Sequence, residues 1–181
     1  MLTGLNTTAA MVIFVLGMLF ASAASAKTFN VDMELNADQT VLTVVARGNC
    51  KKDNHPGCVE TQKGKDADIK FHLKKAHTDC NKAEGAQWEL SAVYLGGKNS
   101  TAKPRSWGNL DAEVAEDFDV ANATTGLLKH ANGSNKRKIS ISNKNQHEYS
   151  IWYTVVASCV GSDGQVLGTV EVDPRVKNVG K

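Results

Sequence analysis

The sequence lacks a second long apolar run, and it lacks a strong excess of either charge. The one apolar run, near the N-terminus of the 181 residues, is too short to span a bilayer well, and no second run follows it. The 21 Lys and Arg nearly balance the 19 Asp and Glu, which leaves a formal net charge of +2. This balance gives no reason to expect nucleic acid or a membrane surface as a partner.

Signatures of catalysis and of redox chemistry are also missing. No G-x-S-x-G elbow of a serine hydrolase occurs, because the VGSDG segment at 160–164 has the composition of a hairpin turn. No C-x-x-C motif of a thiol oxidoreductase occurs either. We therefore expect a protein that is not an enzyme and carries no cofactor. A secreted hydrolase whose carboxylates meet only in three dimensions stays open as an alternative, since its test is spatial.

The one apolar segment has the pattern of a secretory signal peptide. An apolar run begins at Ala9 and leads into small residues that end in Ala24-Ser25-Ala26, an A-x-A cleavage pattern. The pattern predicts that residues 1–26 are a cleaved signal peptide and that residues 27–181 form one exported domain, periplasmic or extracellular. We expect no membrane insertion after cleavage.

Most of the remaining chain shows the period-two alternation of β-strands. The expected strands cover residues 27–35, 40–46, 68–74, 87–95, 137–143, 148–160 and 165–172. In segment 87–95 the pattern puts Trp88, Leu90 and Tyr94 on one face. Segment 148–160 is apolar on both faces, as in a central strand. Asp173-Pro174 is expected to end the last strand, because proline cannot donate to the ladder.

This pattern predicts an all-β fold. The expected architecture is a single antiparallel β-sandwich of immunoglobulin-like or Greek-key type, with long loops at 47–67 and 96–117. The first two strands should form a hairpin. Residues 109–120 fit a short helix, since Leu110, Val114 and Phe118 recur every four residues, but a polar excursion between strands fits equally well.

Cysteine is scarce but even in number. In an exported chain, the four cysteines Cys50, Cys58, Cys80 and Cys159 predict two disulfides, with three alternative pairings. We favour Cys50–Cys58, because Pro56-Gly57 supplies a turn that folds the chain back. The remaining pair, Cys80–Cys159, would tie a loop to the central strand.

A metal site remains an alternative use of this region. The candidate zinc ligands are His55, His72, His77 and Cys80. Against zinc, no C-x2-C pair occurs and lysines flank the histidines. A cupredoxin-type copper site is disfavoured, because neither His nor Met follows Cys159 closely. The acidic run at 111–119 offers oxygen ligands for calcium but lacks the EF-hand spacing and its glycine.

The C-terminal part resembles a known family. The segments KISISNKNQHEYSIWYTVVAS, at 138–158, and VEVDPRVKN, at 170–178, contain an Ile-x-Ile strand, an Asn-rich turn, a Tyr/Ile strand and Asp173-Pro174 with Asn178. This order resembles the ending of the DP-EP family of small bacterial and viral β-sandwich proteins. The resemblance implies a sandwich fold, and because the family offers no established activity it leaves the function open.

We therefore predict an exported binding protein that acts through its surface, on a protein or glycan partner or on further copies of itself. The candidate contact residues are Lys51, Lys52, His55, Arg105 and Trp107. Aromatic and Arg side chains are enriched in binding hot spots, although Trp107 could equally cap the core. The alternatives are a periplasmic metal-binding protein that uses the Cys and His residues of 50–80, and the secreted hydrolase.

Overall fold

The computed structural model describes residues 25–45, 49–50, 55–74, 79–98, 110–118, 127–130 and 137–180, with the backbone alone for 127–130. In chain order the elements are β1 (Lys27–Leu35), β2 (Leu42–Val44), β3 (Val59–Glu60), β4 (Ala67–Leu73), β5 (Gln87–Leu95), α1 (Ala112–Asp117), β6 (Leu127–His130), β7 (Lys138–Asn143), β8 (Glu148–Val160), β9 (Val166–Val172) and β10 (Arg175–Val179). The prediction of a mostly β fold with two disulfides is confirmed.

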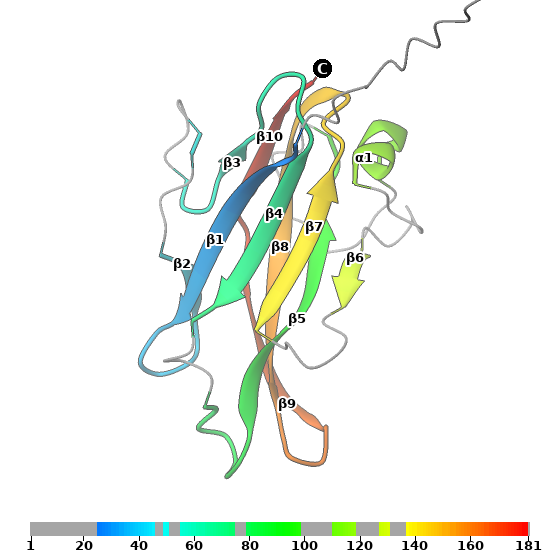
Figure 1. The fold of residues 1–181 in the computed structure, drawn as a ribbon. Helices are drawn as coiled ribbons and strands as arrows, with labels where there is room; N and C mark the ends of the chain where they lie inside the picture. The colour runs from blue at the N-terminus through cyan, green and yellow to red at the C-terminus, as the bar shows by residue number, and fades with distance from the viewer. Residues whose placement is uncertain are drawn as a thin grey trace, which may run out of the picture.

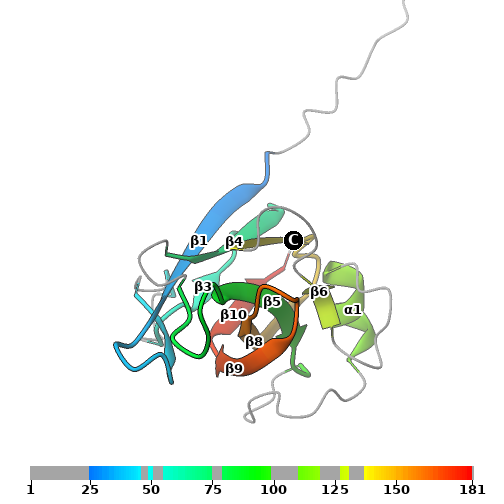
Figure 2. The same cartoon turned by 90° about the horizontal axis from the view of Figure 1, so that it is seen from below.

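The strands form two sheets with the core between them (Figure 1). One sheet is four-stranded, with the order β2-β1-β4-β7. The other is six-stranded and has the order β3-β10-β8-β5-β6, with β9 paired to β8 as well. Seen from below, β5, β8 and β9 curl around the lower end of the molecule instead of lying flat (Figure 2). The second sheet is therefore strongly curved, unlike the flatter sheets of a regular sandwich.

Most neighbouring strands are antiparallel, including the predicted β1–β2 hairpin, but an entirely antiparallel architecture is wrong at two places. β1 runs parallel to β4, with Lys27 opposite Ala67, and β10 runs parallel to β3, with Val176 opposite Val59. Parallel neighbours need a crossover connection. The chain provides one because it leaves the first sheet after β2, forms the edge strand β3 of the second sheet, and returns as β4.

Strand β5 has the predicted bounds but not the predicted faces. Its register with β8 shifts between Leu90 and Ala92, as in a β-bulge. Beyond the shift, Val93 and Leu95 continue the buried face, and Tyr94 is only half-buried. The extra residue exchanges the two faces for the rest of the strand. A prediction that assumes an unbroken period of two therefore assigns these later residues to the wrong faces.

Asp173-Pro174 ends β9 as predicted, but it does not end the sheet. β10 follows on the same edge of β8, and Val172 opposite Val155 and Arg175 opposite Trp152 belong to one register. Across the interruption, the N–H of Tyr153 donates to the carbonyl of Pro174 at 3.0 Å. The proline therefore interrupts a long return strand, because it removes one donor without changing the course of the chain.

The core joins the two sheets through large side chains. The rings of Phe71, from β4, and Tyr153, from β8, lie with their centroids 5.3 Å apart, and both side chains are fully buried. The Cys80–Cys159 disulfide belongs to this core and ties the chain before β5 to the end of β8. On the loop-entropy model, closing so long a loop stabilises the fold by roughly 4.5 kcal/mol.

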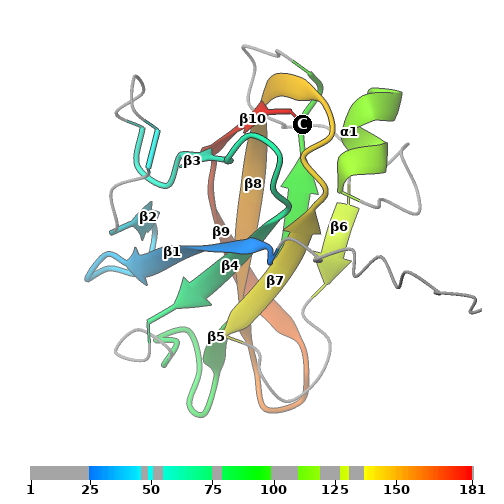
Figure 3. The same cartoon turned by 45° about the horizontal axis from the view of Figure 1, so that its top comes forward.

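The helical alternative for residues 109–120 is confirmed over Ala112–Asp117. Leu110, Val114 and Phe118 are buried, as their four-residue spacing predicts. α1 lies beside β6 at the end of the molecule where the C-terminus lies (Figures 1 and 3).

α1 ends in a buried carboxylate. Asp117 accepts hydrogen bonds from the main-chain N–H groups of Gln146 (2.7 Å) and His147 (3.2 Å) and from the side-chain amide of Asn178 (2.9 Å), and it is 0 % exposed. The imidazole Nδ1 of His147 lies 3.4 Å from one carboxylate oxygen. A buried carboxylate is tolerated only when it is bonded in this way. Asp117 thus ties α1 to the β7–β8 turn and to β10.

Replacing Asp117 by Asn should destabilise the fold strongly. The new NH2 group would face N–H donors that now bind a carboxylate oxygen, so we expect a loss of about 2–4 kcal/mol in the free energy of unfolding. Urea denaturation measures it. Glu116→Gln, on the neighbouring exposed residue, is the control and should change stability by less than about 0.5 kcal/mol. Equal stability of the two variants would contradict the role given to Asp117.

Two buried tyrosines predict a loss of stability in alkali. Burial raises the pKa of Tyr149 and Tyr153 above the ordinary value of 10.0, and for Tyr149 the charge of Asp117 raises the pKa further. Because the folded-state pKa values are raised, this stability is complete below pH 10 and is lost as the pH rises above it. We expect a slope of about 1.4 kcal/mol per pH unit for each tyrosine.

Urea midpoints between pH 9 and 11, with phenolate absorbance at 295 nm, check this expectation. Tyr149→Phe removes one titrating group and should make the slope shallower. Ionisation of both tyrosines near pH 10 in the folded protein would refute it.

Candidate functional site

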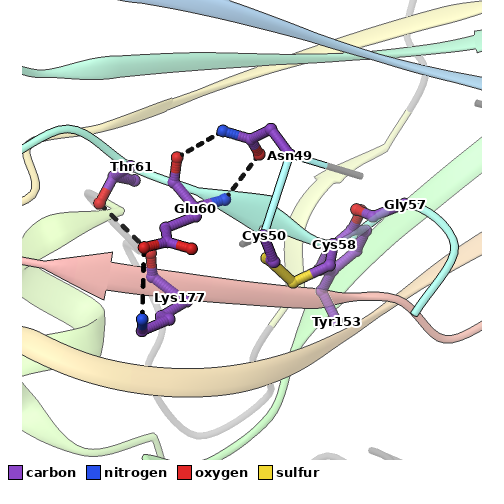
Figure 4. The surroundings of a disulfide bond; sticks show 8 residues. All are labelled: Asn49, Cys50, Gly57, Cys58, Glu60, Thr61, Tyr153 and Lys177. Atoms are coloured by element: carbon purple, nitrogen blue, oxygen red, sulfur yellow. Dashed lines mark hydrogen bonds and ion pairs between the residues drawn. A yellow bond between two sulfur atoms is a disulfide. The ribbon is translucent and has the colours of Figure 1, made fainter. Parts of the chain in front are cut away.

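The Cys50–Cys58 disulfide closes the loop that the sequence singled out, so both predicted cysteine pairings are confirmed (Figure 4). The Cα atoms of Cys50 and Cys58 lie 5.7 Å apart. Beside the bridge, the side chain of Asn49 donates to the carbonyl of Glu60 at 2.7 Å and accepts the N–H of Glu60 at 2.8 Å. The main-chain N–H of Asn49 donates to the carbonyl of Cys58 at 2.9 Å. The two arms of the loop are thus joined covalently and by three hydrogen bonds.

The turn inside this loop is pressed against the edge of the second sheet. Gly57 has a φ of +76°, and a Cβ at this position would lie 3.0 Å from Pro174 Cβ and from Val44 Cγ2. The carbonyl of Gly57 accepts a hydrogen bond of 2.9 Å from the buried hydroxyl of Tyr153. Glycine is needed here for both its backbone conformation and its size. The turn is therefore anchored where Pro174 interrupts the return strand.

Three side chains meet on the outer face of the second sheet, and we call them the Trp152 row: His55, Trp152 and Arg175. Trp152 points outward because Tyr153, its neighbour in β8, points into the core. The imidazole of His55 meets the Trp152 ring edge-on, with centroids 5.2 Å apart and planes at 74°. From the paired position in β10, the guanidinium of Arg175 lies 5.2 Å from the ring centroid, within cation–π range.

Polar pairs flank the Trp152 row on both sides. Next along β10, Lys177 Nζ lies 3.3 Å from Glu60 Oε1. Towards β9, the hydroxyl of Thr154 donates to the carboxylate of Asp173 at 2.5 Å. The row therefore combines a half-buried indole with an imidazole and a guanidinium, and it lies between acids that are already bonded. Such a centre with a polar rim resembles the anatomy of protein-binding surfaces.

A second surface feature lies around the other disulfide. A depression of about 350 Å³ is lined by residues 79–81 and 83–87, on the loop that carries Cys80. Gln39 holds this loop: it donates to the carbonyl of Asp79 at 2.8 Å and accepts from the N–H of Asn81 and the indole N–H of Trp88, both at 2.9 Å. These bonds serve to fix the loop on the β1–β2 turn.

The proposed metal ligands do not come together among the described residues. Cys80 is bonded to Cys159 and so offers no thiolate. His72 lies on the outer face of the four-stranded sheet, 3.3 Å from Asp32, whereas His55 contacts Trp152. His77 lies outside the described residues. In the part of the chain that the structure describes, no three His, Cys, Asp or Glu side chains form a group that could hold a metal ion.

Three acids of the run at 111–119 bind other groups of the fold. Asp111 accepts the main-chain N–H of Lys98 at 2.5 Å, and Glu113 forms an ion pair with the ammonium of Lys98. Asp117 is enclosed by the hydrogen bonds given above, and Asp119 lies outside the described residues. The described carboxylates of the run therefore do not converge on one point, as calcium ligands must.

Of the predicted contact residues, His55 lies at the surface in the Trp152 row, and Lys51, Lys52, Arg105 and Trp107 lie outside the described residues. Sequence reasoning missed Trp152 and Arg175. The alternation of 148–160 contained a signal for Trp152, since it puts this residue opposite to Tyr153. Arg175 could not be found in the same way, because its place depends on the register across Pro174.

No family model matches the chain, and no curated protein matches it. The resemblance of residues 138–178 to the DP-EP family therefore stays a prediction. Among the described residues, no helix is long and apolar enough to cross a membrane.

A pair of glycine variants tests how tightly the loop is packed. Gly57 and Gly64 share a φ of +76°, but a Cβ at Gly64 meets nothing within 4 Å. Gly64→Ala should cost about 1 kcal/mol from backbone strain alone. Gly57→Ala adds the contacts with Pro174 and Val44, so we expect a total cost of about 2–4 kcal/mol. Urea denaturation compares the two variants, and equal costs would show that the turn is not pressed against the sheet.

Proposed function

We propose that this chain is an exported, non-enzymatic protein that binds a partner through the Trp152 row. The partner is a protein, a glycan or a second copy of the chain. One observation carries the proposal: Trp152 is held between His55 and Arg175 on an outer sheet face, beside a loop stiffened by a disulfide. Trp and Arg dominate binding hot spots, and side chains that are already ordered lose less entropy on binding.

Two observations support export. Disulfides persist in oxidising compartments, and the described cysteines are all paired. In addition, β1 begins at Lys27, the residue that directly follows the predicted cleavage site. Removal of residues 1–26 would therefore leave every described strand intact. We place the mature chain in the periplasm or outside the cell.

For the finer architecture, we propose a single immunoglobulin-like sandwich with a curved second sheet. The contact between Phe71 and Tyr153 joins the sheets in one core. The resemblance to the DP-EP family supports the same architecture. It adds no activity, so the proposed function depends on the surface alone.

A capture experiment tests this function. The exported chain, immobilised with its disulfides intact, is incubated with envelope and medium fractions of the organism that encodes it, and its own oligomeric state is measured by light scattering. Trp152→Ala should weaken the retained interaction, or the self-association, by about 30-fold, the effect of losing a hot-spot residue.

The matched control is Ser140→Ala, which alters an exposed side chain in the other sheet. It should bind like the unchanged chain. Near-UV circular dichroism and the urea midpoint verify that Trp152→Ala stays folded. If the folded Trp152→Ala variant binds as well as the control, the Trp152 row is not the binding surface.

A further inference from the structure

The two disulfides lie in different parts of the structure. Cys80 and Cys159 belong to the hydrophobic core cluster. Cys50 and Cys58 are also buried, with 8 % and 1 % of their surface exposed, but they lie outside this core cluster. The Cys50–Cys58 bridge spans only 8 positions of the chain, against 79 for the other. The first bridge therefore constrains one short loop, and the second joins two distant segments of the chain.

The loop closed by Cys50–Cys58 reaches both faces of β8. Trp152 and Tyr153 are consecutive, so their side chains point to opposite faces of the sheet. His55 contacts Trp152 on the outer face, and two residues later Gly57 accepts the hydroxyl of Tyr153 on the inner face. The turn thus wraps around the sheet edge, at the position where Pro174 packs against Gly57.

The bridge holds this wrapped turn at its base. Cys58 follows Gly57 directly, and its N–H donates to the carbonyl of His55 at 3.1 Å, which closes the turn. His55 itself is exposed, and its ring meets that of Trp152 at the surface. The segment that carries His55 is held by the Cys50–Cys58 bridge, by the hydrogen bonds of Asn49 and by the bond from Tyr153 to Gly57.

We propose that Cys50–Cys58 is a positioning pair for the Trp152 row, whereas Cys80–Cys159 stabilises the fold as a whole. The bridge orders His55 against the indole before any partner arrives. This role at a binding surface rests on the proposed function. The placement of His55 by the bridge is a property of the free protein and can be measured without a partner.

The test compares two double variants of the whole chain, Cys50→Ser with Cys58→Ser, and Cys80→Ser with Cys159→Ser. Proton NMR of the His55 ring reports its place, because the ring current of Trp152 shifts these resonances. Trp152→Ala identifies that shift. In the first double variant we expect the shift to fall by more than half while the melting temperature falls by no more than about 10 °C. The second should lose about 15 °C or more, or fail to fold.

The outcomes separate the two proposals. An unchanged His55 shift in the first double variant would show that hydrogen bonds alone position the ring, and unfolding of that variant would make the bridge a structural one; either result overturns the inference. Neither result would alter the binding test of Trp152→Ala. Given a captured partner, the first double variant should bind about tenfold more weakly, since the row is no longer ordered in advance.

Discussion

The thirteen-residue strand β8 needs hydrogen-bond partners along both edges and packing partners on its inner face. The rest of the structure depends on the segments that provide them. One edge pairs with β5 and the other with β9 and then β10. Its inner face supplies Tyr153 and Cys159 to the core, where they meet Phe71 and Cys80 from other parts of the chain. Its other face carries Trp152, which is half-buried, and both edges are paired because buried backbone groups need partners.

At Pro174 the pairing of β8 is interrupted, and there the disulfide-closed loop packs against the sheet. The proline removes one ladder donor and lies close against Gly57, whose carbonyl accepts a hydrogen bond from the hydroxyl of Tyr153. The same turn then places His55 on the outer face of the sheet, against Trp152. A local defect in the return strand thus brings the disulfide-closed loop to the side chains that we assign to binding.

Buried polar groups close the end of the molecule where the C-terminus lies. The amide of Asn145 donates to the carbonyls of Gln62 and Lys65, at 2.9 and 3.0 Å, and its oxygen accepts the hydroxyl of Thr61. Asp117 acts in the same way on α1 and Asn178. Side chains of this kind specify one arrangement of the loops, since each leaves a costly unpaired group if the arrangement changes.

Much of the fold could be predicted, because the alternation of apolar and polar residues in a strand is visible within the strand itself. Alternation located β1, β5, β8 and β9, and the turn at Pro56-Gly57 indicated which cysteines pair. The sequence did not predict β3, because two residues are too few to show an alternation. It did not predict β10, because Asp173-Pro174 is a signal that ends a strand.

By itself, the sequence determined the strand-rich class, the expectation of export and the bonded state of the cysteines, since each depends on neighbouring residues or on composition. Only the tertiary structure decided which strands run parallel, how the bulge in β5 turns its faces, and that His55 meets Trp152 and Arg175. These features depend on register between strands that are distant in the chain. A shift of one residue exchanges the faces of a strand, and local alternation cannot show which register has been chosen.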